Sequence, residues 1–404
     1  MELGPILSAM RRNKVGASVI VMQTAITLAI LCNSLFIIQQ RLRLSNRPTG
    51  AEEETVFTIA NQWVGNPSDL GARVQADLAA LRAVPGVVDA FVSNSYPLSN
   101  GGWDDGISLE AGDLHWVTLG ALYFSDEHGL PTLGLKLIAG RNFNAAEILD
   151  RNDLEGKPPA AVIVSQALAS KLFPQGEALG KSIYLASQKQ KTPIVGIVDR
   201  LQEPWVSAGN RYSENAMLQP YRYVEQYSHY IVRARPGQLD AVIKDTQKQL
   251  LGLSRARILQ RTRTMTESRR LAYRDDRGLA IILAVVSVIL LVVTAFGIIG
   301  VTSFWVTQRR RQIGIRRAMG ATRTAILRYF QTENLMMATA GAALGIVLAI
   351  TLNLWMVGRF EIARLQIGYT IIAAIIVMLL GQIAVLWPAL RAASISPVVA
   401  IRNM

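Results

Sequence analysis

One segment of the chain contains the residue types that bind phosphate in nucleotide-hydrolysing proteins. The segment GEALGKS (176–182) combines two glycines with a lysine and a serine. A phosphate-binding loop has the spacing G-x-x-x-x-G-K-[ST], follows a strand and opens a helix, whose first N–H groups bind the phosphates. Here the glycine spacing is one residue short, and the β-type run SIYLA follows. We therefore interpret the segment as a turn into a strand. No other phosphate-loop pattern occurs in the sequence.

Other residue types that support catalysis or metal binding are scattered along the chain. The histidines show no metal-ligand spacing, and the single cysteine, Cys32, lies in an apolar run. No G-x-S-x-G nucleophile motif occurs, and the adjacent acidic pairs at 104–105 and 275–276 are typical of solvated turns or helix starts. We therefore predict no catalytic residue, no metal site and no cofactor bound by this chain. The three histidines are His115, His128 and His229.

The most specific cluster of functional residue types is the arginine-rich segment RRRQIGIRRAMGATRTAILRYF (309–330). Ile313, Arg316, Arg317 and Gly320 fall at helical spacing, and a second helical run follows. A short basic helix that also carries apolar residues can dock a partner protein through apolar contact and electrostatic steering. The charge alone fits equally a loop that only sets membrane topology. Both hypotheses stay open at this level of the sequence.

Four apolar stretches are long enough to hold this loop at a membrane. About 20 apolar residues cross the roughly 30 Å hydrocarbon core of a bilayer, and a buried helix of a soluble protein seldom runs longer without a charge. The second stretch is longer than a bilayer needs, and the charged, helix-compatible segment 267–278 precedes it. We therefore predict that this span continues into water as one helical stalk. The stretches, all free of acidic and basic residues, are Val15–Ile38, Gly278–Gln308, Asn334–Gly358 and Leu365–Leu390.

The placement of basic residues predicts the topology of these spans. Arginine and lysine gather before the first span, between the second and third spans, and after the fourth. By the positive-inside rule these three segments are cytoplasmic, and residues 39–276 lie on the other side. Of the net charge of +13, residues 41–277 contribute only +2. The basic excess therefore belongs to the membrane flanks, which favours contact with anionic lipid and excludes nucleic acid as the partner.

The ends of the large segment between the first and second spans share a pattern of alternating helices and strands. We predict a helix over 68–86 and a strand over 87–94, and near the other end a helix over 238–253 and a strand over 256–262. Apolar β runs surround a short helix between these ends. This alternation predicts an α+β lobe built from both ends of the segment, with a second lobe inserted near 126–214.

The sequence therefore predicts a membrane α-helical fold with four transmembrane helices. An α+β extracytoplasmic domain of two subdomains is inserted between the first and second helices. At the N-terminus, apolar residues at i, i+3, i+4 and i+7 followed by basic residues predict an amphipathic helix on the inner leaflet. In chain order we predict an amphipathic cytoplasmic helix (1–14), the first span (15–38), the extracytoplasmic domain (39–276), the second span with its stalk (277–308), a cytoplasmic coupling loop (309–328), the third span (329–358), the fourth span (365–390) and a cytoplasmic tail (391–404).

The arginine-rich loop resembles the coupling region of the MacB-type, FtsX-like ABC transporter permeases, whose usual form is R-x-x-E-I-G-I-R-R-A-L-G-A-x-R. Gln312 replaces the usual Glu, and Met319 replaces the usual Leu. The tail WPALRAASISPVVAIRNM (387–404) resembles the family's P-A-x-R-A-A-x-x-x-P-x-x-A-L-R ending, with Leu390 in place of a basic residue, and the start (8–30) is also similar. Further runs resemble the family's periplasmic core domain at 135–143, 162–174, 178–185 and 192–199.

The resemblance implies a permease that relays force and does not hydrolyse ATP itself. A separate cytoplasmic ABC ATPase subunit would bind ATP and Mg, and the permease would form a dimer with a second copy or a homologous permease. ATP-driven closure would move the periplasmic domain along stiff helices (mechanotransmission) to export a peptide, an antibiotic-like molecule or a lipoprotein. A periplasmic adaptor and an outer-membrane channel are further implied partners. The implied location is the bacterial inner membrane, as a multi-pass protein with its large domain in the periplasm.

The resemblance also assigns roles to residues of the loop. Ile313, Ile315, Ala318 and Met319 would supply apolar contact with the ATPase subunit, and Arg316 with Arg317 would supply electrostatic steering. Separately, the G-x-x-x-G of GAALG, Gly341 and Gly345, is expected to pack helices closely. The complete coupling element comprises Arg309, Arg310, Arg311, Gln312, Ile313, Gly314, Ile315, Arg316, Arg317, Ala318, Met319, Gly320, Ala321 and Arg323.

Three alternative functions stay open. The first is an FtsX-like regulator of cell-wall hydrolases that transports nothing. The second is a membrane sensor or scaffold without an ATPase partner. The third, a membrane-anchored hydrolase, is the weakest alternative, because the sequence shows no catalytic constellation.

Overall fold

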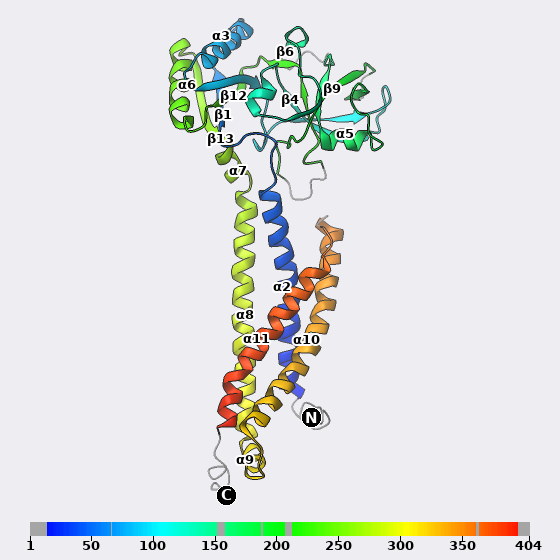
Figure 1. The fold of residues 1–404 in the computed structure, drawn as a ribbon, viewed down its shortest axis with the longest axis vertical. Coiled ribbons are helices and arrows are strands. Elements are labelled where there is room, and N and C mark those ends of the chain that lie inside the picture. Colours follow the sequence, from blue (N-terminus) through cyan, green and yellow to red (C-terminus); the bar gives the residue numbers. More distant parts are fainter. Residues whose placement is uncertain are drawn as a thin grey trace. The chain divides into compact units, whose positions relative to one another are not determined.

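The computed structural model describes residues 14–65, 67–151, 158–186, 189–206, 212–360 and 363–394, and the chain forms two compact units (Figure 1). The helical unit contains the residues up to Leu44 and those from Asp276 onward, and the α+β unit contains Ser45–Asp275. The predicted N-terminal amphipathic helix and most of the predicted tail fall outside the described residues.

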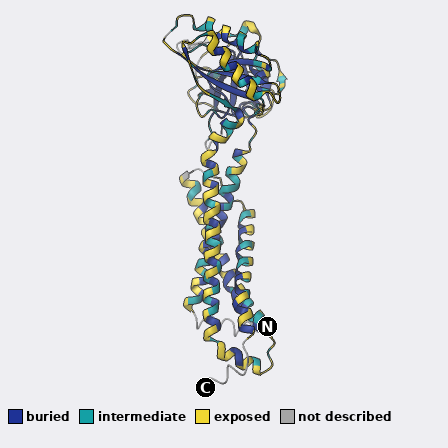
Figure 2. Ribbon diagram, turned by 90° about the vertical axis from the view of Figure 1, so that its left-hand side faces the viewer, coloured by how far each residue is buried: buried dark blue, intermediate teal, exposed yellow. Residues whose placement is uncertain are grey.

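Four helices of the structure are long and apolar enough to cross a membrane. Three of them contain a charge-free stretch in full, and α11 contains all of the fourth stretch except Leu365 and Gln366. Among them α8 is the least buried, and its isoleucines and valines form an exposed apolar surface; Figure 2 shows exposed residues along the helical unit. The helices are α2 (Lys14–Ser45), α8 (Arg274–Gln308), α10 (Arg323–Phe360) and α11 (Ile367–Ala393), with the short helix α9 (Arg310–Ala318) between α8 and α10 in the chain.

Small and polar residues hold α2 against its neighbours. The hydroxyl groups of Thr27 and Thr294 lie 2.8 Å apart, which joins α2 to α8. At Gly341 of α10, an added Cβ would lie 2.7 Å from the Cβ of Thr24, and Gly345 lies similarly close to the backbone of α2. The structure thus places both glycines of the G-x-x-x-G at a helix crossing where no larger side chain fits without displacement.

A four-stranded antiparallel sheet is built from both ends of the α+β unit. Its strand order is β13-β1-β12-β2, with Ile59 opposite Tyr230 in the centre. Side chains alternate between its faces, so that Phe57 packs with two helices while Val56 points to the other side. The elements are β1 (Val56–Trp63), α3 (Leu70–Arg82), β2 (Val87–Ser93), β12 (Tyr227–Ala234), α6 (Leu239–Leu253) and β13 (Arg257–Thr264).

A second sheet has seven strands in the order β5-β9-β7-β10-β4-β3-β8. Because β8 pairs with β9 as well as with β3, six of these strands form a closed ring. The helix α5 (Gln166–Leu172) packs with one face of this sheet. The strands are β3 (Trp103–Ser108), β4 (Thr118–Phe124), β5 (Leu137–Gly140), β7 (Val162–Ser165), β8 (Ser182–Leu185), β9 (Thr192–Val198) and β10 (Ala216–Gln219).

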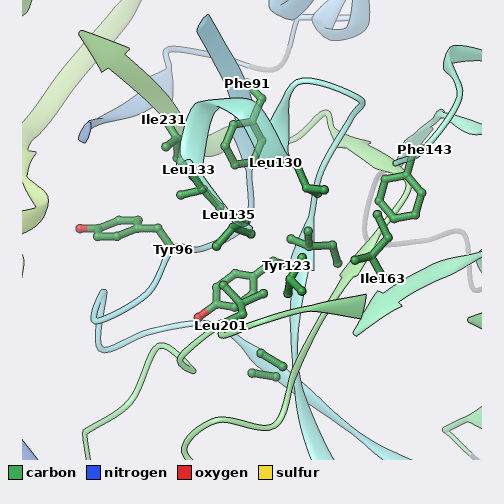
Figure 3. Close-up of a cluster of buried hydrophobic side chains, with 14 of the residues drawn as sticks. Phe91, Tyr96, Tyr123, Leu130, Leu133, Leu135, Phe143, Ile163, Leu201 and Ile231 are labelled. Carbon is green, nitrogen blue, oxygen red and sulfur yellow. The ribbon is translucent and has the colours of Figure 1, made fainter. Parts of the chain in front are cut away.

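The largest buried cluster of the α+β unit contains residues from both sheets (Figure 3). Phe91 and Ile231 come from the four-stranded sheet, whereas Tyr123 and Ile163 come from the seven-stranded sheet. The alternation of strand side chains explains the division, because Val162 and Val164, the neighbours of Ile163, belong to the cluster that contains α5. The two sheets therefore share a continuous apolar core.

The remaining elements complete the α+β unit and include one difference from the prediction. Thr264 caps α7, since its hydroxyl accepts from the N–H of Glu267 at 3.0 Å. We expected one continuous stalk over 267–278, but α7 ends at Ala272, and Tyr273 separates it from α8. The elements are α4 (Gly129–Leu133), the 3₁₀ turn η1 (Ala145–Glu147), β6 (Leu149–Arg151), β11 (Tyr221–Tyr223) and α7 (Met265–Ala272).

Candidate partner-binding site

The arginine-rich loop forms the short helix α9 and a tight turn into α10. The turn closes through hydrogen bonds from Gly320 N to Arg317 O at 3.1 Å and from Ala321 N to Arg316 O at 3.0 Å. Gly320 has a φ of +95°, a conformation that glycine adopts without steric cost, which explains its place directly after the helix. Thr322 then begins α10 by accepting from Ala325 N at 3.2 Å. The two helices are thus joined with defined geometry.

Ile313 fixes α9 to the rest of the helical unit. Its side chain is 6% exposed and belongs to a buried cluster with Trp305 of α8 and Phe330 of α10. Gly314 beside it is also buried. In this chain Ile313 therefore packs internally, whereas the resemblance had assigned it to contact with the ATPase subunit.

The opposite surface of α9 and its turn presents apolar and basic side chains together. Ile315 is 44% exposed and Met319 is 76% exposed, a high value for large apolar residues in a segment that also carries arginines. Arg316 lies over the ring of Tyr329, with its guanidinium carbon 5.3 Å from the ring centroid. The structure thus places two exposed apolar side chains, Ile315 and Met319 (the apolar knob), beside several arginines on one short segment. The other exposed members of the predicted coupling element are Arg310, Arg311, Gln312, Ala318, Gly320 and Arg323.

An ion pair between Arg309 and Glu333, which the sequence did not predict, fixes the start of the arginine-rich loop to α10. Arg309 Nη1 lies 3.0 and 3.1 Å from the two carboxylate oxygens of Glu333, whose side chain is only 2% exposed. The guanidinium group of Arg309 also lies 5.6 Å from the ring of Trp305 and donates to the hydroxyl of Tyr329 at 3.4 Å. Arg309 therefore packs within the helical unit, whereas Arg310 and Arg311 are exposed.

Glu333 could have been found from one signal in the sequence. It is the only acidic residue between positions 278 and 360 and directly precedes the third charge-free stretch. The charge-free stretch begins at Asn334, so a span defined by the absence of charge leaves Glu333 outside. A carboxylate buried in an apolar helix is costly unless a cation pairs with it, so its presence predicts an arginine partner nearby.

The segment and the histidines first considered for nucleotide or metal chemistry have other surroundings in the described part of the chain. In 176–182 the chain turns at Gly176 and Gly180, both at positive φ, and then enters β8, so no helix opens there. Within the described residues no group of three or more His, Cys, Asp or Glu side chains could hold a metal ion. His229 is half-buried, and desolvation lowers its pKa to about 4. His128 Nδ1 lies 2.9 Å from the carboxylate of Asp89.

Two family models match the chain over most of its length. The model of the MacB-like periplasmic core domain matches residues 24–249, which is more than half of the chain, and the model of the FtsX-like permease C-terminal region matches residues 284–397. The chain belongs to the MacB-type, FtsX-like permease family. The FtsX-like match contains α9, its turn, Glu333 and both glycines of the helix crossing. The MacB-like match contains the elements from β1 to β12 and most of α6.

Curated relatives carry names from the same family. The chain is 25% identical over 277 residues to the macrolide export ATP-binding/permease protein MacB of Chromobacterium violaceum, covering 66% of this chain and 41% of that protein. It is 25% identical over 295 residues to the pyoverdine export ATP-binding/permease protein PvdT of Pseudomonas syringae pv. syringae, covering 69% and 42%. The chain thus spans about two fifths of the length of these relatives.

One solved structure from the family was also matched. The crystal structure of the periplasmic region of MacB from Actinobacillus actinomycetemcomitans aligns with 57% of this chain and 97% of that chain. The TM-score is 0.35 and the sequence identity is 14%.

Proposed function

We propose that this chain is the permease subunit of an ABC transporter and relays force to its α+β domain. A separate cytoplasmic ABC ATPase subunit, carrying ATP and Mg, would bind the exposed face of α9 and its turn. The observation that carries the proposal is the exposed pair Ile315 and Met319 among arginines, on a segment fixed from inside by Ile313 and Arg309. Such a surface offers apolar contact and electrostatic steering to a partner. Because Ile313 and Arg309 pack inside the helical unit, a movement of the partner would be transmitted to the helices.

The relatives' printed names support export as the outcome of this movement. Both are described as export ATP-binding/permease proteins, one for macrolides and one for pyoverdine. We infer that this chain takes part in export of a peptide, an antibiotic-like molecule or a lipoprotein, in the bacterial inner membrane with the α+β domain in the periplasm. Regulation of cell-wall hydrolases and a sensor role are the alternatives, and these relatives do not favour them.

We further propose that the two sheets of the α+β unit belong to two subdomains inserted between the first and second spans. The four-stranded sheet draws strands from both ends of the segment, as a discontinuous subdomain would. The seven-stranded sheet would be the second subdomain, which we placed near 126–214 and which would also include β3 and β4. A periplasmic adaptor and an outer-membrane channel are the further partners of this proposal.

The exposed side of α8 supports a second permease copy or a homologous permease as partner. Its large apolar side chains suit contact with lipid, and in the proposed dimer another helix would pack on part of this surface through van der Waals contact. The most exposed include Ile281, Ile282, Val285, Val288, Ile289 and Phe296.

The test of the proposal is the combined substitution Arg316→Ser, Arg317→Ser and Met319→Ser. We expect the tagged native chain, purified in mild detergent, to retain a subunit that hydrolyses ATP in the presence of Mg. The triple variant should lose that subunit, because it lacks both the apolar knob and two of the cations. The matched control is Arg391→Ser, an exposed arginine on α11 outside the site. Full retention by the triple variant would refute the assignment of the site.

Stability measurements on the triple variant show whether it loses the partner because the binding surface is changed or because the chain is unfolded. Arg316 and Met319 are exposed and Arg317 is half-buried, so the free energy of unfolding of the triple variant should stay within about 1 kcal/mol of the native value. Absence of any ATP-hydrolysing subunit from the native chain would favour the sensor or scaffold alternative.

A further inference from the structure

The chain passes between its helical and α+β units through two connectors. The first connector, residues 46–55, follows α2, and the second connector, residues 265–273, consists of α7 and the residue that separates it from α8. The first connector has no regular secondary structure before β1. A segment of this kind usually opens easily, because few backbone hydrogen bonds hold it.

One arginine of the second connector binds the last residue of α2 and two points of the first connector. The guanidinium group of Arg269 donates to the carbonyl oxygens of Ser45 and Arg47, each at 2.7 Å. It also donates to both carboxylate oxygens of Glu53, at 2.6 and 2.5 Å. This set of contacts uses the planar fork of arginine, which a lysine could not reproduce.

The neighbouring arginine shows that this arrangement is specific to one position. The side chain of Arg269 is 15% exposed, whereas that of Arg270 is 70% exposed. The guanidinium Nη2 of Arg270 lies 4.0 Å from the carboxylate of Glu267, one turn earlier on the same helix. Arg270 therefore belongs to the solvated side of α7 and provides a matched control.

A glutamine ties both connectors to the seven-stranded sheet. Gln202, which follows β9, donates its backbone N–H to Thr49 O and its side-chain Nε2 to the hydroxyl of Tyr273, both at 2.9 Å. The backbone carbonyl oxygen of Gln202 accepts a hydrogen bond from the hydroxyl of Tyr123 of β4 at 2.7 Å. One residue thus contacts the first connector, the end of the second connector and a strand of the sheet.

The close approach of two backbones at this point supports a built junction. Gly50 has a φ of +91°, and an added Cβ would lie 2.1 Å from the carbonyl oxygen of Arg200. Only glycine allows this approach. The first connector therefore packs directly on the segment that follows β9.

We propose that Arg269 is the positioning residue of a junction that makes the two connectors one body and joins them to both sheets. The α7 helix and β1 adjoin the connectors and lead to the four-stranded sheet, while Gln202 leads to the seven-stranded sheet. A displacement that arrives through α2 or α8 then reaches both sheets together. This inference deepens the proposed function, since it names the part of the chain that receives the relayed force.

The first test is hydrogen exchange of the full-length chain purified in detergent. Arg269→Met should accelerate amide exchange over 45–55 and 199–203 by at least about tenfold, because the bonds to a charged donor that close these segments are lost. Exchange in the central strands β7 and β12 should stay as in the native chain. Arg270→Met should change neither region. Glu53→Gln removes the charge and keeps the shape, and should give a smaller acceleration of the same segments.

Two results would overturn the junction. One is Arg269→Met with unchanged exchange over 45–55. The other is exchange that rises equally in β7 and β12, because Arg269 would then support the whole unit and not the junction. If Arg269→Met does not yield folded protein, the same comparison of amide exchange is made with Glu53→Gln and Arg269→Lys. Each should accelerate exchange over 45–55 and 199–203 and leave β7 and β12 unchanged.

The second test connects the junction to function. In complex with the ATP-hydrolysing subunit, the native chain should show nucleotide-dependent exchange in the first connector and in the seven-stranded sheet. Arg269→Met should keep the subunit bound in full amount and lose the nucleotide-dependent change in the sheet. Retention of that change would contradict the inference. If no ATP-hydrolysing subunit binds the native chain, the proposed function fails, and the first test still decides whether the junction exists.

Discussion

Two arginine–glutamate pairs, one in each unit, differ in what surrounds the carboxylate. Glu333 is 2% exposed among apolar side chains of the helical unit, and Arg309 is the charged partner that the structure shows for it. Glu53 is 19% exposed in the α+β unit, and the hydroxyl of Thr49 also donates to it at 2.7 Å. A buried carboxylate with one cation depends on that cation far more than a carboxylate with several donors near water. The comparison predicts that similar substitutions have unequal effects.

The largest effect should come from the helical unit. Glu333→Ala leaves Arg309 without its carboxylate in an apolar environment, so the free energy of unfolding should fall by about 3–5 kcal/mol. Thermal or denaturant unfolding of the purified chain in detergent measures this change. Arg310→Ala, at an exposed position next to Arg309, is the control and should change it by less than about 0.5 kcal/mol.

The double variant Arg309→Met with Glu333→Leu separates the charge from the packing. Replacing a buried ion pair by apolar residues of similar volume is often neutral, so the double variant should return to within about 1 kcal/mol of the native chain. A double variant as unstable as Glu333→Ala would show that packing geometry, and not an uncompensated charge, explains the loss.

A third carboxyl group extends the comparison to a buried acid whose charged form is unfavourable. Burial raises the pKa of Glu203 to about 7. The positive charge of Arg47 lowers this pKa and the negative charge of Asp104 raises it, but burial is the largest effect. Because the folded pKa lies above the unfolded value of about 4.3, stability falls as pH rises between these values, by roughly 4 kcal/mol in total. Glu203→Gln removes this loss. The variant should be more stable than the native chain at pH 8 and equally stable at pH 4.

Unfolding curves at pH 4, 6 and 8 measure this difference. Glu110→Gln, at an exposed position of the same unit, is the matched control. A constant difference between Glu203→Gln and the native chain across this range would contradict the burial of an ionisable group.

The smallest effect, and the opposite sign with pH, is expected at Glu53. Although burial raises the pKa of Glu53, the hydrogen bonds and charge of Arg269 outweigh it and lower the pKa below its ordinary value. The pair therefore adds stability above the unfolded pKa, and this stability is lost as pH falls through the folded pKa. Native chain and Glu53→Gln should differ by about 1–2 kcal/mol at pH 7 and converge in acid. A difference that grows on acidification would reverse the assigned sign.

The sequence predicts local elements well where periodicity and end signals agree. The helix expected over 68–86 is α3 (Leu70–Arg82), and the strand expected over 87–94 is β2 (Val87–Ser93). The helix expected over 238–253 is α6 (Leu239–Leu253). These predictions are confirmed because each rests on a pattern within one short segment, bounded by turn residues.

Features that depend on distant partners could not be predicted in the same way. The order β13-β1-β12-β2 depends on pairing between strands about 200 residues apart, which no local pattern encodes. The inward position of Ile313 depends on α8 and α10, and the pairing of Arg309 depends on Glu333. The break at Tyr273 was missed because the charged segment around it is helix-compatible on both sides. The candidate site was thus located by its residue types, while its division into inner and outer faces needed the fold.

The closed ring of strands has a consequence for the contacts of the α+β unit with other proteins. A strand at the margin of a sheet offers unsatisfied amide and carbonyl groups that a foreign chain can extend, which leads to aggregation. Because β8 bonds to β3 on one side and to the beginning of β9 on the other, the margin that these strands would expose is sealed by the sheet itself. The domain therefore needs no covering partner to protect that margin from unwanted polymerisation.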